Sequence, residues 1–464
     1  MDYYELRTLV SKITPRQTRF LSTKVKGSIK EKGRKANYYQ FNLLQQGWNK
    51  QERLLNTEEV ASFLEVSLRA QACPMPLNLD VWDAKICPYN CHYCFANAFR
   101  DSLYTSFFDN SRTLGIRHCS PDYYKSELDK LFKYRGKKVD GADERIKAIS
   151  MNIPMRFGIR FEDFLPIEGK KKISLALLNY LKENAYPVMI NTKSELIGRE
   201  DYVRALADNP AKAAVHITMI TSDDNINKRL EPGAPSFAKR IEAAKSLADA
   251  GVRVVARIEP FMTFINDEPD EVEHYMQMIH AAGIRHMTFD TYSYSANNPR
   301  IRAAFYYQGY DFERMFTLMS DCQWLGSLLL GKFMDLFRDY GLQCSTFDMG
   351  NVPTNDDLIC CCVGDWFQNS QWNLGSIVPM VRFIIHHSPK AISWEDYNKW
   401  VGDNWLSQNL KQQVHGLWNL IGNTAYCPDW APGIVPVGVD QYGKIWKYDV
   451  SLPDFRMEML KKVI

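Results

Sequence analysis

Residues 85–97 read KICPYNCHYCFAN and place Cys87, Cys91 and Cys94 in a Cys-x3-Cys-x2-Cys array. Thiolates are the preferred ligands of iron–sulfur clusters, and three thiolates so close in sequence can hold one side of a cubic cluster. Because the array has no fourth cysteine, one iron would stay open to a substrate or cofactor. The alternative is zinc with His92 as a nitrogen ligand, but structural zinc sites usually have four closed ligands in paired arrays.

The residues that follow alternate short apolar runs with helical patterns. The predicted strands are Ile149–Ile153, Val188–Asn191, Val215–Ile220, Val252–Ile258 and His286–Phe289. The predicted helices between them are Ser174–Asn184, Phe237–Ala250 and Glu271–Ala282. This alternation predicts an α/β fold with a parallel sheet, closing as a partial or full (β/α) barrel. In such folds the functional residues lie at the carboxyl ends of the strands.

Composition divides the chain into three regions. We expect a basic N-terminal extension at 1–70, the partial barrel at 71–300, and a mostly helical region at 301–464 that contains nine of the 11 tryptophans. The last region is a candidate for substrate binding or for an auxiliary cluster.

Overall composition excludes several classes of protein. With 45% hydrophobic and 24% charged residues, the 464-residue chain is globular, and its net charge of +3 excludes binding to nucleic acid or membrane by bulk charge alone. No apolar run reaches the ~18 residues of a membrane span, and the N-terminus lacks the pattern of a secretory signal. Eleven cysteines are too few for a disulfide scaffold in a chain of this length. We therefore expect a cytoplasmic protein without a membrane partner.

The pattern Cys87-x3-Cys91-x-Tyr93-Cys94 resembles the radical S-adenosylmethionine superfamily. The segments 155–168, 187–200 and 217–261 look like its spore photoproduct lyase-like, or DNA repair photolyase-like, branch. The resemblance implies that the open iron of a [4Fe-4S] cluster chelates the amine and carboxylate of S-adenosylmethionine. It further implies that one electron cleaves the sulfonium C–S bond, and that the resulting 5′-deoxyadenosyl radical abstracts hydrogen.

Carried over residue by residue, the resemblance gives each motif a role. Cys87, Cys91 and Cys94 would hold the cluster, and Tyr93 would lie against the adenine. Lys193 would contact the cofactor carboxylate, which needs a charge-assisted partner when buried. Thr218 would lie near the ribose or the amino acid part, and Glu168 would accept hydrogen bonds from the amine or the ribose hydroxyls. The alternatives are an exposed strand-end lysine for Lys193, structural roles for Thr218 and Glu168, and a local salt bridge for Arg229 with Glu231.

Two positions depart from the lyase pattern. Ile159 stands where the lyase has a hydrogen-donating cysteine, and Phe95 stands where it has a relaying tyrosine. Spore photoproduct repair in its known form is therefore not expected. Other thiols offer a replacement: Cys361 or Cys362 as hydrogen donor, and Cys344, Cys360 and Cys427 as ligands of a possible second cluster. The alternative is that these cysteines are small buried hydrophobic residues.

Basic residues between positions 12 and 35 form either a solvated basic tail or a site of phosphate contact. Phosphate contact is favoured where lysine and arginine neutralise backbone charge and the aromatic residues that follow stack on bases. The leading hypothesis is a radical enzyme that modifies or repairs a nucleic-acid base or nucleotide. It would need an electron donor such as flavodoxin or ferredoxin. The alternatives are a radical enzyme acting on a peptide or small metabolite, and a non-catalytic iron–sulfur protein.

Overall fold

The computed structural model describes residues 1–26, 57–59, 64–66, 75, 77–83, 87–94, 116–139, 144–159, 161–292, 299–348, 350–357, 359–367, 375, 377–421, 432–452 and 454–462.

The central element is an eight-stranded sheet in the order β11-β10-β9-β8-β7-β6-β3-β2. Seven of its strands are parallel, and they are β3 (Leu77–Leu79), β6 (Met155–Phe157), β7 (Val188–Thr192), β8 (Ala213–Thr218), β9 (Arg253–Phe261), β10 (His286–Thr291) and β11 (Gln343–Thr346). The edge strand β2 (Leu64–Val66) is antiparallel to β3. The predicted α/β fold is confirmed; the sheet stays open, and no closed barrel forms in the described part of the chain.

Helices connect the parallel strands. They are α6 (Glu144–Ser150), α7 (Glu168–Lys171), α8 (Ile173–Glu183), the 3-10 helix η2 (Glu195–Gly198), α9 (Glu200–Ala207), α10 (Asp224–Leu230), α11 (Phe237–Asp249), α12 (Pro269–Ala281), α13 (Pro299–Tyr307), α14 (Phe312–Asp321) and α15 (Gln323–Asp339). On the outer face of the sheet, Phe289 of β10 packs edge-to-face against Phe333 and Phe337 of α15. This packing leaves the opposite face of β10 for the interior of the partial barrel.

One predicted strand is wrong. Ile149 lies in α6, which ends at Ser150, and the strand β6 begins only at Met155. The apolar residues Ile149 and Ile153 are both fully buried, so the run has the burial of a strand without its backbone conformation. The sheet also extends past the predicted boundary at 300, because β11 lies at Gln343–Thr346.

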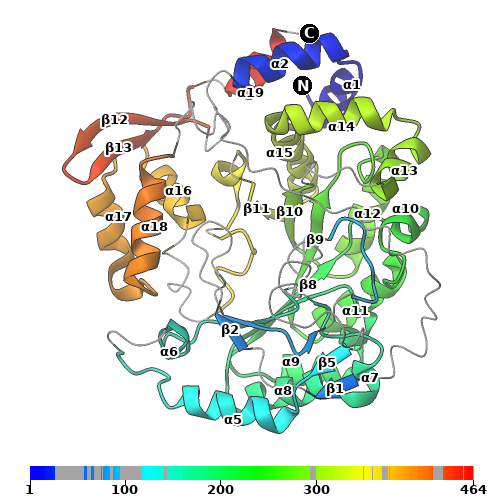
Figure 1. The fold of residues 1–464 in the computed structure, drawn as a ribbon, viewed down its shortest axis with the longest axis vertical. Coiled ribbons are helices and arrows are strands. Elements are labelled where there is room, and N and C mark those ends of the chain that lie inside the picture. Colours follow the sequence, from blue (N-terminus) through cyan, green and yellow to red (C-terminus); the bar gives the residue numbers. More distant parts are fainter. Residues whose placement is uncertain are drawn as a thin grey trace, which may run out of the picture.

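Smaller elements flank the core. Strands β1 (Thr57–Glu59), β5 (Ile116–His118) and β4 (Trp82–Asp83) form a second sheet, followed by α5 (Pro121–Phe132). The C-terminal region holds the 3-10 helix η3 (Val352–Thr354), α16 (Ile377–His386), α17 (Trp394–Val401), η5 (Gly402–Asn404), α18 (Gln408–Trp418), the hairpin β12 (Ile434–Asp440) and β13 (Gly443–Tyr448), and α19 (Phe455–Lys461). Figure 1 shows β8 to β11 in the middle of the molecule, with α10, α12 and α13 on one side and α16 to α18 on the other.

The N-terminal region begins with two helices, α1 (Tyr3–Ser11) and α2 (Pro15–Lys26), whereas residues 27–56 lie outside the described part. Arg7 of α1 forms an ion pair of 3.0 Å with Asp267, a buried residue that follows β9. Tyr3 donates a hydrogen bond to the same carboxylate. The start of the predicted basic extension is therefore docked on the core, and in Figure 1 it lies beside α19 near the C-terminus.

Among the described residues, no helix combines the length and the apolar character that a bilayer crossing requires.

Candidate functional site

The cysteine triplet lies on a short loop that follows β4. Two turns shape this loop: the amide of Asn90 donates to the carbonyl of Cys87 (2.9 Å), and the amide of Cys94 donates to the carbonyl of Cys91 (3.2 Å). Asn90 adopts a left-handed backbone conformation with φ of 47°, which asparagine tolerates better than most residues. Cys91 is buried, whereas Cys87 and Cys94 are half-buried.

The turn after α10 packs directly against this loop. The amide of His92 donates to the carbonyl of Leu230 (2.8 Å), and the amide of Gly233 donates to the carbonyl of Tyr89 (3.1 Å). A Cβ atom at Gly233 would lie 2.2 Å from the carbonyl oxygen of Pro88. Glycine is therefore required here because the two backbones approach so closely.

Glu231, in the same turn, is the centre of a buried polar network. Its fully buried carboxylate accepts a hydrogen bond from the Tyr93 hydroxyl, pairs with Arg240 at 2.5 Å, and lies 3.8 Å from the Lys193 ammonium. Burial alone would raise the pKa of Glu231, but Arg240 and then Lys193 hold it below its usual range. Glu231 therefore stays charged and connects the cysteine loop to β7 and α11. Glu231 does not form the alternative local salt bridge with Arg229 in the described part of the chain, and the Arg229 guanidinium lies over the Tyr307 ring.

Lys193 immediately follows β7, and its predicted contact with the cofactor carboxylate stays a prediction. Its ammonium lies 5.5 Å from the centre of the Tyr93 ring, and its side chain is 17% exposed. Its backbone amide donates to Glu162 (2.9 Å), which also accepts from the Thr192 hydroxyl (2.7 Å). Glu162 therefore fixes the end of β7. Sequence reasoning missed this role, because the only signal was an acidic residue in a segment that departs from the family pattern.

Thr218 ends β8 on the inner face of the sheet. Its carbonyl accepts a hydrogen bond from the buried Arg240 (2.8 Å), and it pairs in register with Arg257 of β9. The predicted cofactor residues Tyr93, Lys193 and Thr218 are thus linked through Glu231 and Arg240. A role of Thr218 near the ribose or amino acid part of the cofactor stays a prediction.

Glu168 does not take part in this network. Its fully buried carboxylate accepts hydrogen bonds from three backbone amides at the start of α8 and from the side chains of Trp82 and Tyr202. Five donors occupy the roughly four lone-pair positions of a carboxylate. The prediction that Glu168 contacts the cofactor is therefore corrected: it caps α8 and anchors Trp82.

The residues around the cysteine loop fit a cluster and S-adenosylmethionine. Three thiols share one loop, a lysine ammonium stands beside them, and the buried Asn191 Oδ1 has no hydrogen-bond partner in the described residues. A buried polar atom without a partner costs free energy unless a ligand satisfies it. No group of three ligands among the described residues is arranged around a single metal ion. A cubic cluster does not require three ligands around one ion, because each thiolate binds a different iron.

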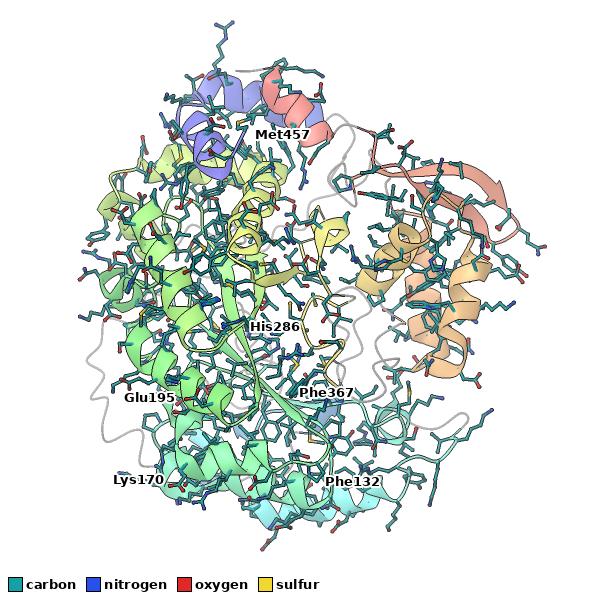
Figure 2. The ribbon with its side chains drawn as sticks, turned by 180° about the vertical axis from the view of Figure 1, so that it is seen from behind. Phe132, Lys170, Glu195, His286, Phe367 and Met457 are labelled. Carbon is teal, nitrogen blue, oxygen red and sulfur yellow. The ribbon has the colours of Figure 1, made fainter. Side chains whose placement is uncertain are left out.

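The C-terminal thiols lie at the other end of the sheet. Cys362 Sγ donates to the carbonyl of Met287 (3.1 Å), near the start of β10, and the Cys362 carbonyl accepts from Arg253 (3.2 Å), the first residue of β9. The segment ends near Phe367, which Figure 2 places with His286 close to the middle of the molecule. The structure therefore does not bring the candidate hydrogen donors Cys361 and Cys362 to the triplet, which lies at the carboxyl ends of the strands.

The candidate ligands of a second cluster are also buried. Cys360 and Cys361 lie with their sulfur atoms 3.7 Å apart, and Cys344 donates to the carbonyl of Leu342 (3.7 Å). Burial raises the pKa of the Cys344 thiol well above its ordinary value, as it also does for the Cys91 thiol of the triplet. Cys427 lies outside the described residues.

Residues 84–279 match the family model of the Radical SAM superfamily. The matched stretch contains the cysteine loop and the strands β6 to β9, and over this stretch, which is less than half of the chain, the protein is similar to radical SAM domains.

Curated relatives share parts of the chain. An uncharacterised protein of Mycobacterium bovis is 19% identical over 217 residues, which are 47% of this chain and 59% of the relative. An uncharacterised protein of Methanocaldococcus jannaschii is 31% identical over 104 residues, covering 22% of this chain and 39% of the relative. The chain thus spans less than two thirds of the length of the relatives that it matches.

Among solved structures, a mutant of spore photoproduct lyase is similar with a TM-score of 0.37 and 13% identity, over 54% of this chain and 65% of that chain. Streptococcus suis SuiB bound to S-adenosylmethionine is similar with a TM-score of 0.38 and 14% identity, over 77% of this chain and 71% of that chain.

Proposed function

We propose that the chain holds a [4Fe-4S] cluster on Cys87, Cys91 and Cys94 and binds S-adenosylmethionine beside it. When bound, these two groups supply reductive cleavage of the sulfonium C–S bond and a 5′-deoxyadenosyl radical that abstracts hydrogen from a substrate. The observation that carries the proposal is the buried network that joins the cysteine loop to Lys193 through Tyr93 and Glu231.

The chain's own residues have separable tasks in this proposal. Lys193 supplies a cation for the carboxylate of S-adenosylmethionine, and Tyr93 offers a ring for the adenine. Glu162 fixes the backbone of Lys193, and Glu231 orients Tyr93 and Lys193 at once. Thr218 and Asn191 present polar atoms on the inner face of the sheet, where the ribose and the amino acid part need partners.

The direct test is formation of 5′-deoxyadenosine by the anaerobically reconstituted protein with S-adenosylmethionine and dithionite. The wild-type protein is expected to form it, and Cys91→Ala is expected to lose both the cluster absorbance and the cleavage. Cys119→Ala, which removes a buried cysteine outside the loop, serves as the matched control and retains both. Cleavage by the Cys91→Ala protein would refute the assignment of the triplet.

The first of two candidate substrates is a nucleic-acid base or nucleotide, which the basic residues between 12 and 35 favour. Because residues 15–26 form α2, a deletion would also remove a structured helix. We therefore suggest replacing Lys30, Lys32, Arg34 and Lys35 together by glutamine. The affinity for a single-stranded oligonucleotide should fall, and the slope of log K against log salt should become shallower by about 0.7 per lost phosphate contact. Unchanged affinity and slope would contradict a nucleic-acid partner at this segment.

The second candidate substrate is a peptide or small metabolite, which the acidic residues at the ends of β9 and β10 favour.

We also propose a flavodoxin or ferredoxin as electron donor and a cytoplasmic location, since a low-potential cluster suits a reducing compartment. A second cluster on Cys344, Cys360 and Cys427 is a further hypothesis. About four irons per chain would exclude it, and about eight would support it.

A further inference from the structure

The inner face of the sheet carries acidic side chains on β9 and β10, the strands that follow Thr218 of β8 in the sheet order. By register, Thr218 of β8, Arg257 of β9 and Thr288 of β10 form one row across the sheet. The register of β9 and β10 shifts just beyond this row, between Phe289 and Thr291. Glu259 nevertheless pairs with Arg257, and Asp290 interacts with both of these residues, so the two carboxylates lie next to the row. The inner face of β9 and β10, here called the wall, therefore lies beside the strands whose residues Lys193 and Thr218 would hold S-adenosylmethionine.

Acidic groups dominate this wall. Arg257 forms an ion pair with Glu259, while Asp290 stands near Glu259 and near Asp348, which follows β11. Burial, then Glu259 and Asp348, raise the pKa of Asp290 to about 8, and Arg257 and the Thr291 amide only partly oppose this. Asp290 thus has two carboxylates near it, Glu259 and Asp348, which makes this part of the wall unfavourable for a phosphate and favourable for a cation.

A second observation indicates that this wall binds a ligand. Thr288 is 1% exposed, and its hydroxyl has no hydrogen-bond partner in the described part of the chain. It lies on the same face as Asp290 and beside Arg257. A buried hydroxyl without a partner is costly, and a ligand group lying on this face of β9 and β10 would satisfy it.

Building on the proposed radical function, we propose that Asp290 and Glu259 bind a positively charged group of the substrate, an amine or a guanidinium. The substrate would then be an amine- or guanidine-bearing peptide or metabolite, held next to the site of hydrogen abstraction. A cation between the two carboxylates relieves their repulsion, and its N–H groups can reach both carboxylates and the Thr288 hydroxyl.

The test uses calorimetric titration of the reconstituted holoenzyme with three probes. Nα-acetylarginine amide carries the guanidinium, Nα-acetylcitrulline amide is its neutral counterpart of similar shape, and thymidine 5′-monophosphate represents a nucleotide. We expect the arginine probe to bind at least about tenfold more tightly than the citrulline probe. Asp290→Asn and Glu259→Gln should each remove most of this preference. Glu273→Gln, at an exposed position on α12, should leave it unchanged.

The pH dependence provides an independent readout. A protonated carboxyl cannot pair with a cation, so wild-type affinity for the arginine probe should fall roughly twentyfold between pH 8.5 and pH 6.5. The guanidinium of the probe stays charged throughout this range. The Asp290→Asn protein should show only a small remaining change, because its amide does not titrate.

Equal affinity for the arginine and citrulline probes, or tighter binding of the nucleotide, would overturn the inference. An unchanged preference in both variants would do the same. Formation of 5′-deoxyadenosine is measured on the same preparations, so the two proposals can fail separately. A wild-type protein that cleaves S-adenosylmethionine but shows no preference for the cation refutes only the substrate class, whereas absence of cleavage refutes the proposed function.

Discussion

At the scale of single residues, Glu231 is the residue near the cysteine loop whose replacement should lower stability most. Replacing it by glutamine leaves the buried Arg240 without its charged partner, and losing one member of a buried pair costs about 3–5 kcal/mol. Glu231→Gln should therefore lower the free energy of unfolding in urea by about 3 kcal/mol. Tyr93→Phe removes only the hydroxyl and should cost about 1–3 kcal/mol.

The change in unfolding free energy with pH tests the same role of Glu231. The pKa of Glu231 is held below its usual range in the folded protein, so its stabilisation is present above the unfolded pKa of about 4.3. That stabilisation is lost as the pH falls through the lower, folded pKa. The Glu231→Gln protein should therefore lose less stability on acidification than the wild type. Equal unfolding free energies at neutral pH would contradict the network, and Glu273→Gln is the exposed control.

At the scale of elements, the docking of the turn after α10 on the cysteine loop is the decisive contact. In Gly233→Ala, the added methyl group would meet the backbone of Pro88 and Tyr89, which a rigid loop cannot avoid. We expect iron and sulfide content after reconstitution to fall to less than about half of the wild-type value. Gly416→Ala in α18 has open space around it and should keep full content. Full cluster occupancy in Gly233→Ala would show that the turn does not constrain the loop.

The elements also show how far sequence reasoning reaches. The strands β7 to β10 were predictable because buried parallel strands have continuous apolar runs, whereas Ile149–Ile153 has such a run at the end of a helix. Local motifs suffice to propose roles for the triplet and Lys193, and these roles stay predictions. The roles of Glu231 and Glu162 were not, because they depend on contacts between segments far apart in the sequence. Glu168 was misassigned for the same reason: its partners Trp82 and Tyr202 belong to other elements.

At the scale of the whole molecule, α1 ties the N-terminus to the core through Asp267. This carboxylate is fully buried and pairs with Arg7, which also pairs with Glu268. Arg7→Ala should lower the free energy of unfolding by about 3 kcal/mol, because a buried charge loses its partner. The change should leave the formation of 5′-deoxyadenosine per bound cluster intact, since α1 docks beyond the cysteine loop. Thermal or urea unfolding measures the first effect, and unaltered stability would contradict the docking of α1.

The proposed function requires an open iron at a cluster held by Cys87, Cys91 and Cys94. The electron paramagnetic resonance spectrum of the reduced protein, recorded with and without S-adenosylmethionine, tests this claim most directly. A cofactor that binds the open iron should shift the spectrum of a single [4Fe-4S] cluster, and Cys94→Ala should abolish the signal. A spectrum that does not respond to S-adenosylmethionine, or a cluster signal that persists in Cys94→Ala, would contradict the account.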